Sequence, residues 1–284
     1  MDQAQKLRDI IGETAPEISD SRIITISSGK GGVGKTNFTV NLGIALAKQG
    51  KRVSIIDADL GLANVDVLFG IVTKYNLSNV IKGEISVQEC IVKGPHDINI
   101  ISGGSGIMDL IDLDNNQLDK LIHTLSYFNT ISDYILIDTG AGLSKSVLSF
   151  VEAASDVVLI ITPDPTSITD AYALIKNITS DDEKKIKLII NRVDSNEEGD
   201  EVYYKLEQAV SKFLGRDLEN LGYIFEDSNL KRSVRKQIPL LEAYPRAIAS
   251  KGIENIAYNL INNHKYAKSN TSFRMFLNKL MNKI

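Results

Sequence analysis

The feature that most constrains the fold is the glycine-rich segment 29–36, GKGGVGKT, which lies between an apolar run and a helical pattern. Its spacing, Gly-x-x-x-x-Gly-Lys-Thr, is typical of a phosphate-binding loop. Glycines let the backbone curl so that several N–H groups point at one anion, and the N-terminus of the following helix adds partial positive charge. The segment therefore predicts a nucleotide site at a strand-to-helix connection. A glycine-rich turn that binds nothing is the alternative.

Each part of this loop has an expected role. Lys35 is expected to reach the β- and γ-phosphates of a nucleotide, and Thr36 is expected to hold Mg²⁺. The predicted nucleotide contacts in this region are Gly31, Gly32, Val33, Gly34, Lys35, Thr36 and Asn37.

Short apolar runs alternate along the chain with helical patterns. Several runs are apolar at every position, which is typical of strands buried on both faces. The alternation predicts an α/β fold with a doubly wound, mainly parallel sheet flanked by helices, in which ligands bind at the carboxyl ends of the strands. The acidic segment 194–201 is expected to be a surface loop. Strands are expected at 23–27, 53–56, 98–101, 134–137, 157–162 and 188–191, and helices at 37–48, 115–127, 143–153 and 167–179.

Composition narrows the classes of protein further. The 284 residues are 43% hydrophobic and 24% charged, as in ordinary globular proteins, so disorder of the whole chain is excluded. The single cysteine, Cys90, cannot form a disulfide within the chain or a cysteine-rich metal site. No apolar run approaches the roughly 20 residues of a membrane span, and the polar N-terminus is unlike a signal peptide. A cytoplasmic protein is expected.

The formal charge of −4 is unevenly distributed. Five lysine or arginine residues and no acid follow Glu254, which leaves −9 on residues 1–254. An acidic body should not bind nucleic acid non-specifically, so direct DNA binding is not expected. The basic tail, in contrast, is suited to an anionic surface.

Acidic residues stand at the ends of two predicted strands. Asp57 and Asp59 follow the run 53–56, and residues two apart on an extended chain point to the same side. Asp138 ends the run 134–137 and precedes Thr-Gly-Ala-Gly, an arrangement in which the acid contacts Mg²⁺ and the glycines permit a mobile switch. A helix cap or a strand-end turn is the structural alternative for these acids.

The second lysine of the loop, Lys30, makes the segment resemble the deviant Walker A motif of the MinD/ParA family, P-loop NTPases of the SIMIBI class. The resemblance implies ATP or ADP and Mg²⁺ as cofactors and an ATP-dependent homodimer, in which Lys30 reaches the partner protomer's phosphates. It implies that Asp59 orients the attacking water and that Asp57 supports the Mg²⁺ held by Thr36 and Asp138. Catalysis would then rest on Lys30, Lys35 and Asp59; a solvated loop cation is the alternative for Lys30.

Further positions match the same family. Asn191 and Arg192 resemble its base-recognition position, and an asparagine amide can both donate to and accept from adenine. The loop 224–228 resembles a second base contact, although Phe225 stands where relatives commonly have proline. Asp170 resembles an acid that pairs with the early lysine at rest, with an acid on a helix surface as the alternative.

Within the family, several segments resemble the flagellar number regulators, the FlhG/FleN (YlxH) branch. They are 57–68, 76–84, 102–106 and 138–142. MinD usually has Ser-Pro in place of Thr139-Gly140. The resemblance implies regulation of flagellar number or placement, with flagellar C-ring components or a flagellar transcription regulator as partners.

The N-terminus supports the same branch. Asp2, Gln3 and Ala4 resemble the short activator helix of these regulators, which stimulates the SRP-type GTPase FlhF. A frayed helix of chance similarity is the alternative. The chain is thus divided into an activator helix and linker (1–21), a MinD-like P-loop ATPase domain (22–264), and a linker with a C-terminal amphipathic helix (265–284).

The last residues carry apolar side chains on one helical face. A helix over 273–284 is about 18 Å long, too short to cross a bilayer but able to lie on one. Two copies on a dimer would bind the inner face of the cell membrane with higher avidity. A helix packed permanently on the body, or one docked in the monomer and released by ATP, are the alternatives. The expected membrane residues are Phe273, Phe276, Leu277, Leu280, Met281 and Ile284.

Taken together, the sequence predicts an ATP-dependent, dimerising, membrane-associating ATPase switch. A MinD-type division-site regulator is the first alternative, and a ParA-type DNA partition ATPase is the second. Iron–sulfur relatives of the family need a Cys-x-x-Cys pair, which Cys90 alone cannot supply.

Overall fold

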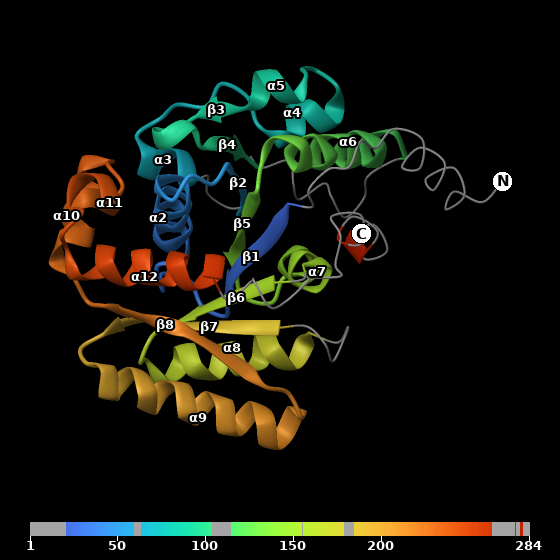
Figure 1. The fold of residues 1–284 in the computed structure, drawn as a ribbon. Coiled ribbons are helices and arrows are strands. Elements are labelled where there is room, and N and C mark those ends of the chain that lie inside the picture. Colours follow the sequence, from blue (N-terminus) through green and yellow to red (C-terminus); the bar gives the residue numbers. More distant parts are fainter. Residues whose placement is uncertain are drawn as a thin grey trace.

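The computed structural model describes residues 21–59, 64–103, 115–154, 156–178, 185–262, 276, 279 and 280 (Figure 1). The strands are β1 (Arg22–Ser28), β2 (Val53–Ala58), β3 (Val92–Lys93), β4 (Asn99–Ser102), β5 (Tyr134–Ala141), β6 (Asp156–Ile161), β7 (Lys185–Val193) and β8 (Leu218–Phe225). They form one sheet in the order β3-β4-β2-β5-β1-β6-β7-β8, and neighbours are parallel except β3 and β4. The predicted doubly wound, mainly parallel sheet is confirmed.

Helices connect the strands. They are α2 (Lys35–Lys48), α3 (Val65–Phe69), α4 (Leu77–Lys82), α5 (Val87–Cys90), α6 (Asn115–Ile131), α7 (Lys145–Ala153), α8 (Pro165–Asn177), α9 (Asn196–Leu214), α10 (Ser228–Lys236), α11 (Leu240–Ala243) and α12 (Ile248–Asn262). The helices α2 and α12 cover one face of the sheet, and α7, α8 and α9 cover the other (Figure 1).

The strands bury side chains on both faces, and this produces two hydrophobic cores. In β1, Ile24 and Ile26 pack under α2 and α12, whereas Ile23 joins the core beneath α7, α8 and α9. Successive residues of a strand point to opposite faces, so a strand covered on both sides is apolar throughout. This explains why the apolar runs located six of the strands.

The acidic segment 194–201 is not a surface loop, as the sequence suggested, but contains the start of α9. Ser195 caps this helix by accepting a hydrogen bond from the Glu198 backbone N–H. Acidic side chains are favourable in a first helical turn, where Glu197 and Glu198 lie, because they complement the helix dipole. A run of acidic residues is therefore compatible with either a surface loop or a helix start. The Ser195 cap and the buried face of α9 favour the helix.

Several predicted residues lie outside the described part of the chain. They are Asp2, Gln3, Ala4, Phe273, Leu277, Met281 and Ile284, together with 60–63, 104–106 and the linker 265–272. Among the residues that are described, no helix has both the length and the apolar character needed to cross a bilayer.

A buried ion cluster joins strands at the edge of the sheet opposite the loop. The Asp156 carboxylate accepts from Arg22 Nε at 2.6 Å and also pairs with Lys187. Burial alone would raise the pKa of Asp156, but Arg22 and Lys187 outweigh it and bring the pKa to about 2. The carboxylate is therefore held charged, and its removal would leave Arg22 without its carboxylate partner and Lys187 with only the more distant Glu219, 4.0 Å away.

We expect Asp156→Asn to lower the free energy of unfolding by about 3–5 kcal/mol at neutral pH. Because the folded-state pKa lies below the unfolded value of about 3.9, the stabilisation is present above pH 4 and is lost as the pH falls towards 2. The difference in free energy of unfolding between wild type and variant, measured by urea titration, should therefore decrease as the pH falls from 4 to 2. Asp133→Asn, which removes a more exposed pair with Arg52, is the control and should cost about 1 kcal/mol or less. Equal losses in both variants would contradict the assignment.

Candidate nucleotide-binding site

The predicted phosphate-binding loop connects β1 to α2 at the carboxyl edge of the sheet. Gly32 and Gly34 have φ values of 78° and 98°, a left-handed backbone that side chains disfavour. Gly34 is also the N-cap of α2, and no side chain caps that end of the helix. The first N–H groups of α2 are thus not claimed by a capping side chain, which leaves them suited to an anion.

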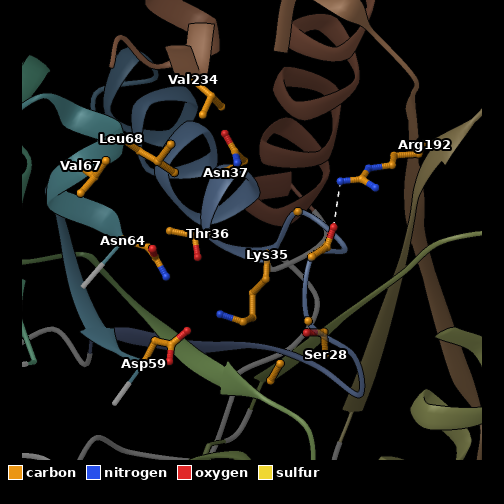
Figure 2. Close-up of a pocket in the computed structure, with 14 residues that line it drawn as sticks. Ser28, Lys35, Thr36, Asn37, Asp59, Asn64, Val67, Leu68, Arg192 and Val234 are labelled. Atoms are coloured by element: carbon orange, nitrogen blue, oxygen red, sulfur yellow. Dashed lines mark hydrogen bonds between the residues drawn. The ribbon is translucent and has the colours of Figure 1, made fainter. Parts of the chain in front are cut away.

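A cavity of about 370 Å³ opens over this loop (Figure 2). That volume is in the range of small-ligand sites. Of the predicted nucleotide contacts, Val33 and Asn191 are buried side chains that do not line this cavity. The predicted residues that do line it are Gly31, Gly32, Gly34, Lys35, Thr36, Asn37, Asp59 and Arg192.

Beneath the cavity lies a buried charged centre. Lys35 Nζ donates to Asp138 Oδ1 at 3.1 Å, and the Thr39 hydroxyl donates to the same oxygen at 3.0 Å. Asp57 on β2 is the register partner of Asp138 on β5, so two carboxylates lie side by side. The sheet thus brings together the predicted lysine and both predicted acids.

The carboxylates of this centre are crowded. Burial raises the pKa of Asp57 to about 7, and the nearby Asp138 charge adds to the rise. Burial also raises the pKa of Asp138, although Lys35, Thr36 and Thr39 oppose it. Both acids therefore favour additional positive charge beside Lys35.

The residues present fit a Mg²⁺ ion. Asp138 Oδ2 is buried and has no hydrogen-bond partner in the described structure, and the Thr36 hydroxyl lowers the pKa of the same carboxylate. Hard oxygen donors of this kind suit Mg²⁺, with Thr36 and Asp138 as the residues that would hold it. When bound, the ion neutralises charge on the terminal phosphates.

Asp57 and Asp59 take different positions, although they are only two residues apart. Asp57 is 1% exposed, and its oxygens accept from the backbone N–H groups of Asp59, Asn64 and Val65. It thereby ties the start of α3 to the end of β2. Asp59 lines the cavity, and its Oδ1 lies 3.6 Å from where a Cβ on Gly140 would stand. Only Asp59 is thus placed to meet a ligand in the cavity.

Lys30 points away from the cavity. Its Nζ donates to the Thr166 hydroxyl of α8 at 2.8 Å, and it is Thr166, not Asp170, that accepts from the lysine. The Asp170 backbone instead packs on Gly29, where an added Cβ would lie 2.4 Å from the Asp170 carbonyl carbon. A glycine at 29 is therefore required for the loop to approach α8.

The end of β7 holds the outer side of the loop. Asn191 Nδ2 donates to the Val33 carbonyl at 2.7 Å. Arg192 Nη2 donates to the Gly32 carbonyl at 2.8 Å (Figure 2). Asn191 Oδ1 also accepts from the Arg192 backbone N–H. Both ends of the Asn191 amide are thus engaged by the chain itself. Its role in base recognition stays a prediction.

Sequence reasoning missed several residues of the site. Thr39 and Thr166 act through single hydroxyls on Asp138 and Lys30, and a lone threonine in a helix gives no signal. Val67 of α3 and Val234 of α10 line the mouth of the cavity. Thr39 had one available clue, because it lies one helical turn after Lys35, on the same face.

The fold and the loop define a class of nucleotide-binding protein, and comparison with known sequences agrees. The sequence model of the CobQ/CobB/MinD/ParA nucleotide binding domain matches residues 24–240. The chain therefore belongs to this family, as the deviant loop predicted.

Among individual proteins, the chain is similar to the antiactivator FleN of Pseudomonas aeruginosa, with 40% identity over 237 residues that cover 83% of this chain and 85% of FleN. It is 37% identical to the flagellum site-determining protein YlxH of Helicobacter pylori over 266 residues, 91% of this chain and 90% of YlxH. The structure resembles the septum site-determining protein MinD of Pyrococcus horikoshii complexed with Mg-ADP, with a TM-score of 0.68 and 25% identity over 87% of this chain and 99% of MinD.

The predicted chemistry is confirmed at the level of the family. The chain is a MinD-like ATPase, and its cofactors are ATP or ADP and Mg²⁺. The individual roles of Lys30, Asp57 and Asp59 stay predictions.

We expect Asp59→Asn to bind Mg·ATP within about threefold of wild type but to lose about 100-fold or more of its hydrolysis rate, because a positioned carboxylate contributes on that scale. Single-turnover hydrolysis and equilibrium titration separate the two quantities. Asp66→Asn, in the first turn of α3 and hydrogen-bonded to Thr73, is the matched control and should hydrolyse normally. Normal turnover by Asp59→Asn would remove Asp59 from the reaction.

Proposed function

We propose that the protein is an ATP-dependent, dimerising switch that associates with the inner face of the cell membrane and regulates flagellar number or placement. The observation that carries this proposal is the similarity to FleN and YlxH, at 40% and 37% identity over most of each chain. Thr139-Gly140 after the buried Asp138 supports the same branch, since MinD usually has Ser-Pro there.

The position of Lys30 supports a dimer. Within the described residues it is not part of the cavity lining of its own chain, and its ammonium group is held on Thr166. A lysine that does not face its own nucleotide is available to a nucleotide in a second protomer. Around the cavity mouth, Val67 and Val234 are exposed apolar side chains, which a facing protomer would cover.

The C-terminal residues support a membrane switch with a docked resting state. Phe276 and Leu280 are each 2% exposed and belong to the core on the α7–α9 face. Two apolar side chains of the predicted lipid-binding face are thus buried in the protein. Lipid binding therefore requires their release, and ATP-driven dimerisation is the proposed trigger.

The proposed partners follow from the same branch. Asp2, Gln3 and Ala4 would stimulate the SRP-type GTPase FlhF, and the ATP-bound dimer would act on flagellar C-ring components or a flagellar transcription regulator. The anionic inner membrane would receive the basic C-terminal segment. The protein would cycle between the cytoplasm and that surface, without direct contact with DNA.

A MinD-type division-site regulator is the second candidate, because a MinD structure shares the fold at a TM-score of 0.68. That reading expects contact with a division inhibitor and no effect on FlhF. A ParA-type partition ATPase would need ATP-dependent binding to DNA, which the acidic body disfavours.

Deletion of residues 273–284 is expected to abolish binding to anionic vesicles while sparing nucleotide binding. The deletion removes the apolar face, and each fully buried Leu or Phe is worth about 1.5–3 kcal/mol. Vesicle sedimentation with Mg·ATP measures the first property, and nucleotide titration shows that the truncated chain is folded. Asn278→Ser, a polar position in the same segment, is the control. If the truncated protein sediments with the vesicles as well as the full chain does, the membrane proposal is contradicted.

A peptide of residues 1–22 is expected to stimulate GTP hydrolysis by FlhF from the same organism. The same peptide carrying Gln3→Ala should lose this effect, and phosphate release over time measures both. The full-length protein is assayed in parallel, so that a peptide that fails to fold on FlhF does not decide the result. If neither the peptide nor the protein stimulates FlhF, the result favours a MinD-type division-site regulator over a flagellar regulator.

A further inference from the structure

The helix α10 carries a concentrated positive charge on its exposed surface. Four of its nine residues are basic, none is acidic, and all four basic side chains are exposed. They occur as two pairs spaced four apart, and like charges at that spacing destabilise a helix. The helix dipole favours Arg235 and Lys236 in the last turn, but it does not favour Lys231 and Arg232. The four residues, named here the α10 ridge, are Lys231, Arg232, Arg235 and Lys236.

The α10 ridge lies at the rim of the nucleotide cavity. Val234, which lies between Arg232 and Arg235 in the sequence, lines the cavity mouth (Figure 2). Lys231 Nζ lies 3.3 Å from Glu226 Oε1, and Glu226 Oε2 lies 3.9 Å from Arg192 Nε. Arg192 in turn donates to the Gly32 carbonyl. A continuous set of charged groups thus leads from the ridge to the phosphate-binding loop.

The far end of α10 is fixed to the other side of the cavity mouth. Gly70, which ends α3, packs against the Gln237 carbonyl, where an added Cβ would stand at 2.7 Å. Because α3 supplies Val67 and Leu68 to the cavity lining, the ridge is held in place beside the opening. The positive charge of the α10 ridge therefore lies beside the opening through which a ligand enters the cavity.

The charge of the rest of the molecule makes this position significant. Residues 1–254 carry −9, and three carboxylates, Asp57, Asp59 and Asp138, lie in or beneath the cavity. A nucleotide is an anion, so the field of the whole body repels it during approach. A local positive surface at the mouth opposes this repulsion, and such surfaces raise rates of association.

We propose that the α10 ridge steers nucleotides into the site electrostatically, so that it raises the association rate without contacting the bound nucleotide. This inference rests on nucleotide binding and not on the flagellar or membrane proposals. Steering acts before contact, so its removal slows association and leaves dissociation unchanged. It is also screened by salt, because the Debye length falls from about 10 Å at 0.1 M to about 3 Å at 1 M.

The test compares two double variants that lower the net charge equally. Arg232→Gln/Arg235→Gln alters the ridge; these positions are chosen because Lys231 pairs with Glu226 and Lys236 packs over the Tyr244 ring. The control is Lys176→Gln/Lys205→Gln. These two exposed lysines lie on α8 and α9, which start at the cavity edge of the sheet and run back to the opposite edge.

Association and dissociation of fluorescent ADP and ATP analogues with Mg²⁺ are measured by stopped flow on the full chain. At low ionic strength, the ridge variant should associate about threefold or more slowly than the control, with dissociation rates that agree within about twofold. The difference should be larger for the ATP analogue, which carries one more negative charge, and should disappear near 1 M salt. The ADP analogue keeps the result independent of ATP-driven dimerisation.

Two results overturn the proposal. Equal association rates in the ridge and control variants would show that only net charge matters. A change confined to the dissociation rate would show that the ridge contacts bound nucleotide instead of steering it. Equal thermal unfolding midpoints for both variants exclude a folding defect. The variant Arg232→Glu/Arg235→Glu doubles the charge change from −2 to −4 and should slow association further than the neutral pair.

Discussion

The contact between Lys35 and Asp138 is the interaction on which the rest of the site depends. It joins the start of α2 to the end of β5, and the pairing of β5 with β2 places Asp57 alongside. Asp57 in turn fixes the backbone that leads into α3. One buried centre therefore connects the loop, two strand ends and the segment that carries Asp59. Because burial disfavours charged carboxylates, the centre holds its charge only while Lys35 and its other donors stay in place.

The two faces of the sheet serve different parts of the proposed cycle. The face under α2 and α12 is continuous with α10 and the cavity mouth, whereas the opposite face buries Phe276 and Leu280. In the proposed cycle, a signal from the nucleotide would have to reach this opposite face. The phosphate-binding loop already contacts α8 on that face, through Lys30 and Thr166.

Local patterns explain how much of this architecture could be predicted from the sequence. The loop and the acid at 138 lie next to apolar runs, and each is recognisable within about ten residues. Contacts such as Thr166 with Lys30 could not be predicted, because they depend on which strands are neighbours and in what register. The start of α9 was misjudged because acids suit both a loop and a first helical turn. The strand β8 gave no apolar run, since Glu219, Asn220 and Gly222 interrupt it.

The hydrogen bonds from the end of β7 to the phosphate-binding loop matter for any attempt to alter nucleotide preference. Asn191 is the predicted base contact, and its amide donates to the Val33 carbonyl, one residue before Gly34 and the start of α2. An added Cβ on Gly34 would meet that same amide at 2.5 Å. The predicted base contact and the shape of the phosphate-binding loop thus depend on the same side chain. A variant at Asn191 that is designed to accept a different base therefore also needs a replacement for the hydrogen bond to the Val33 carbonyl.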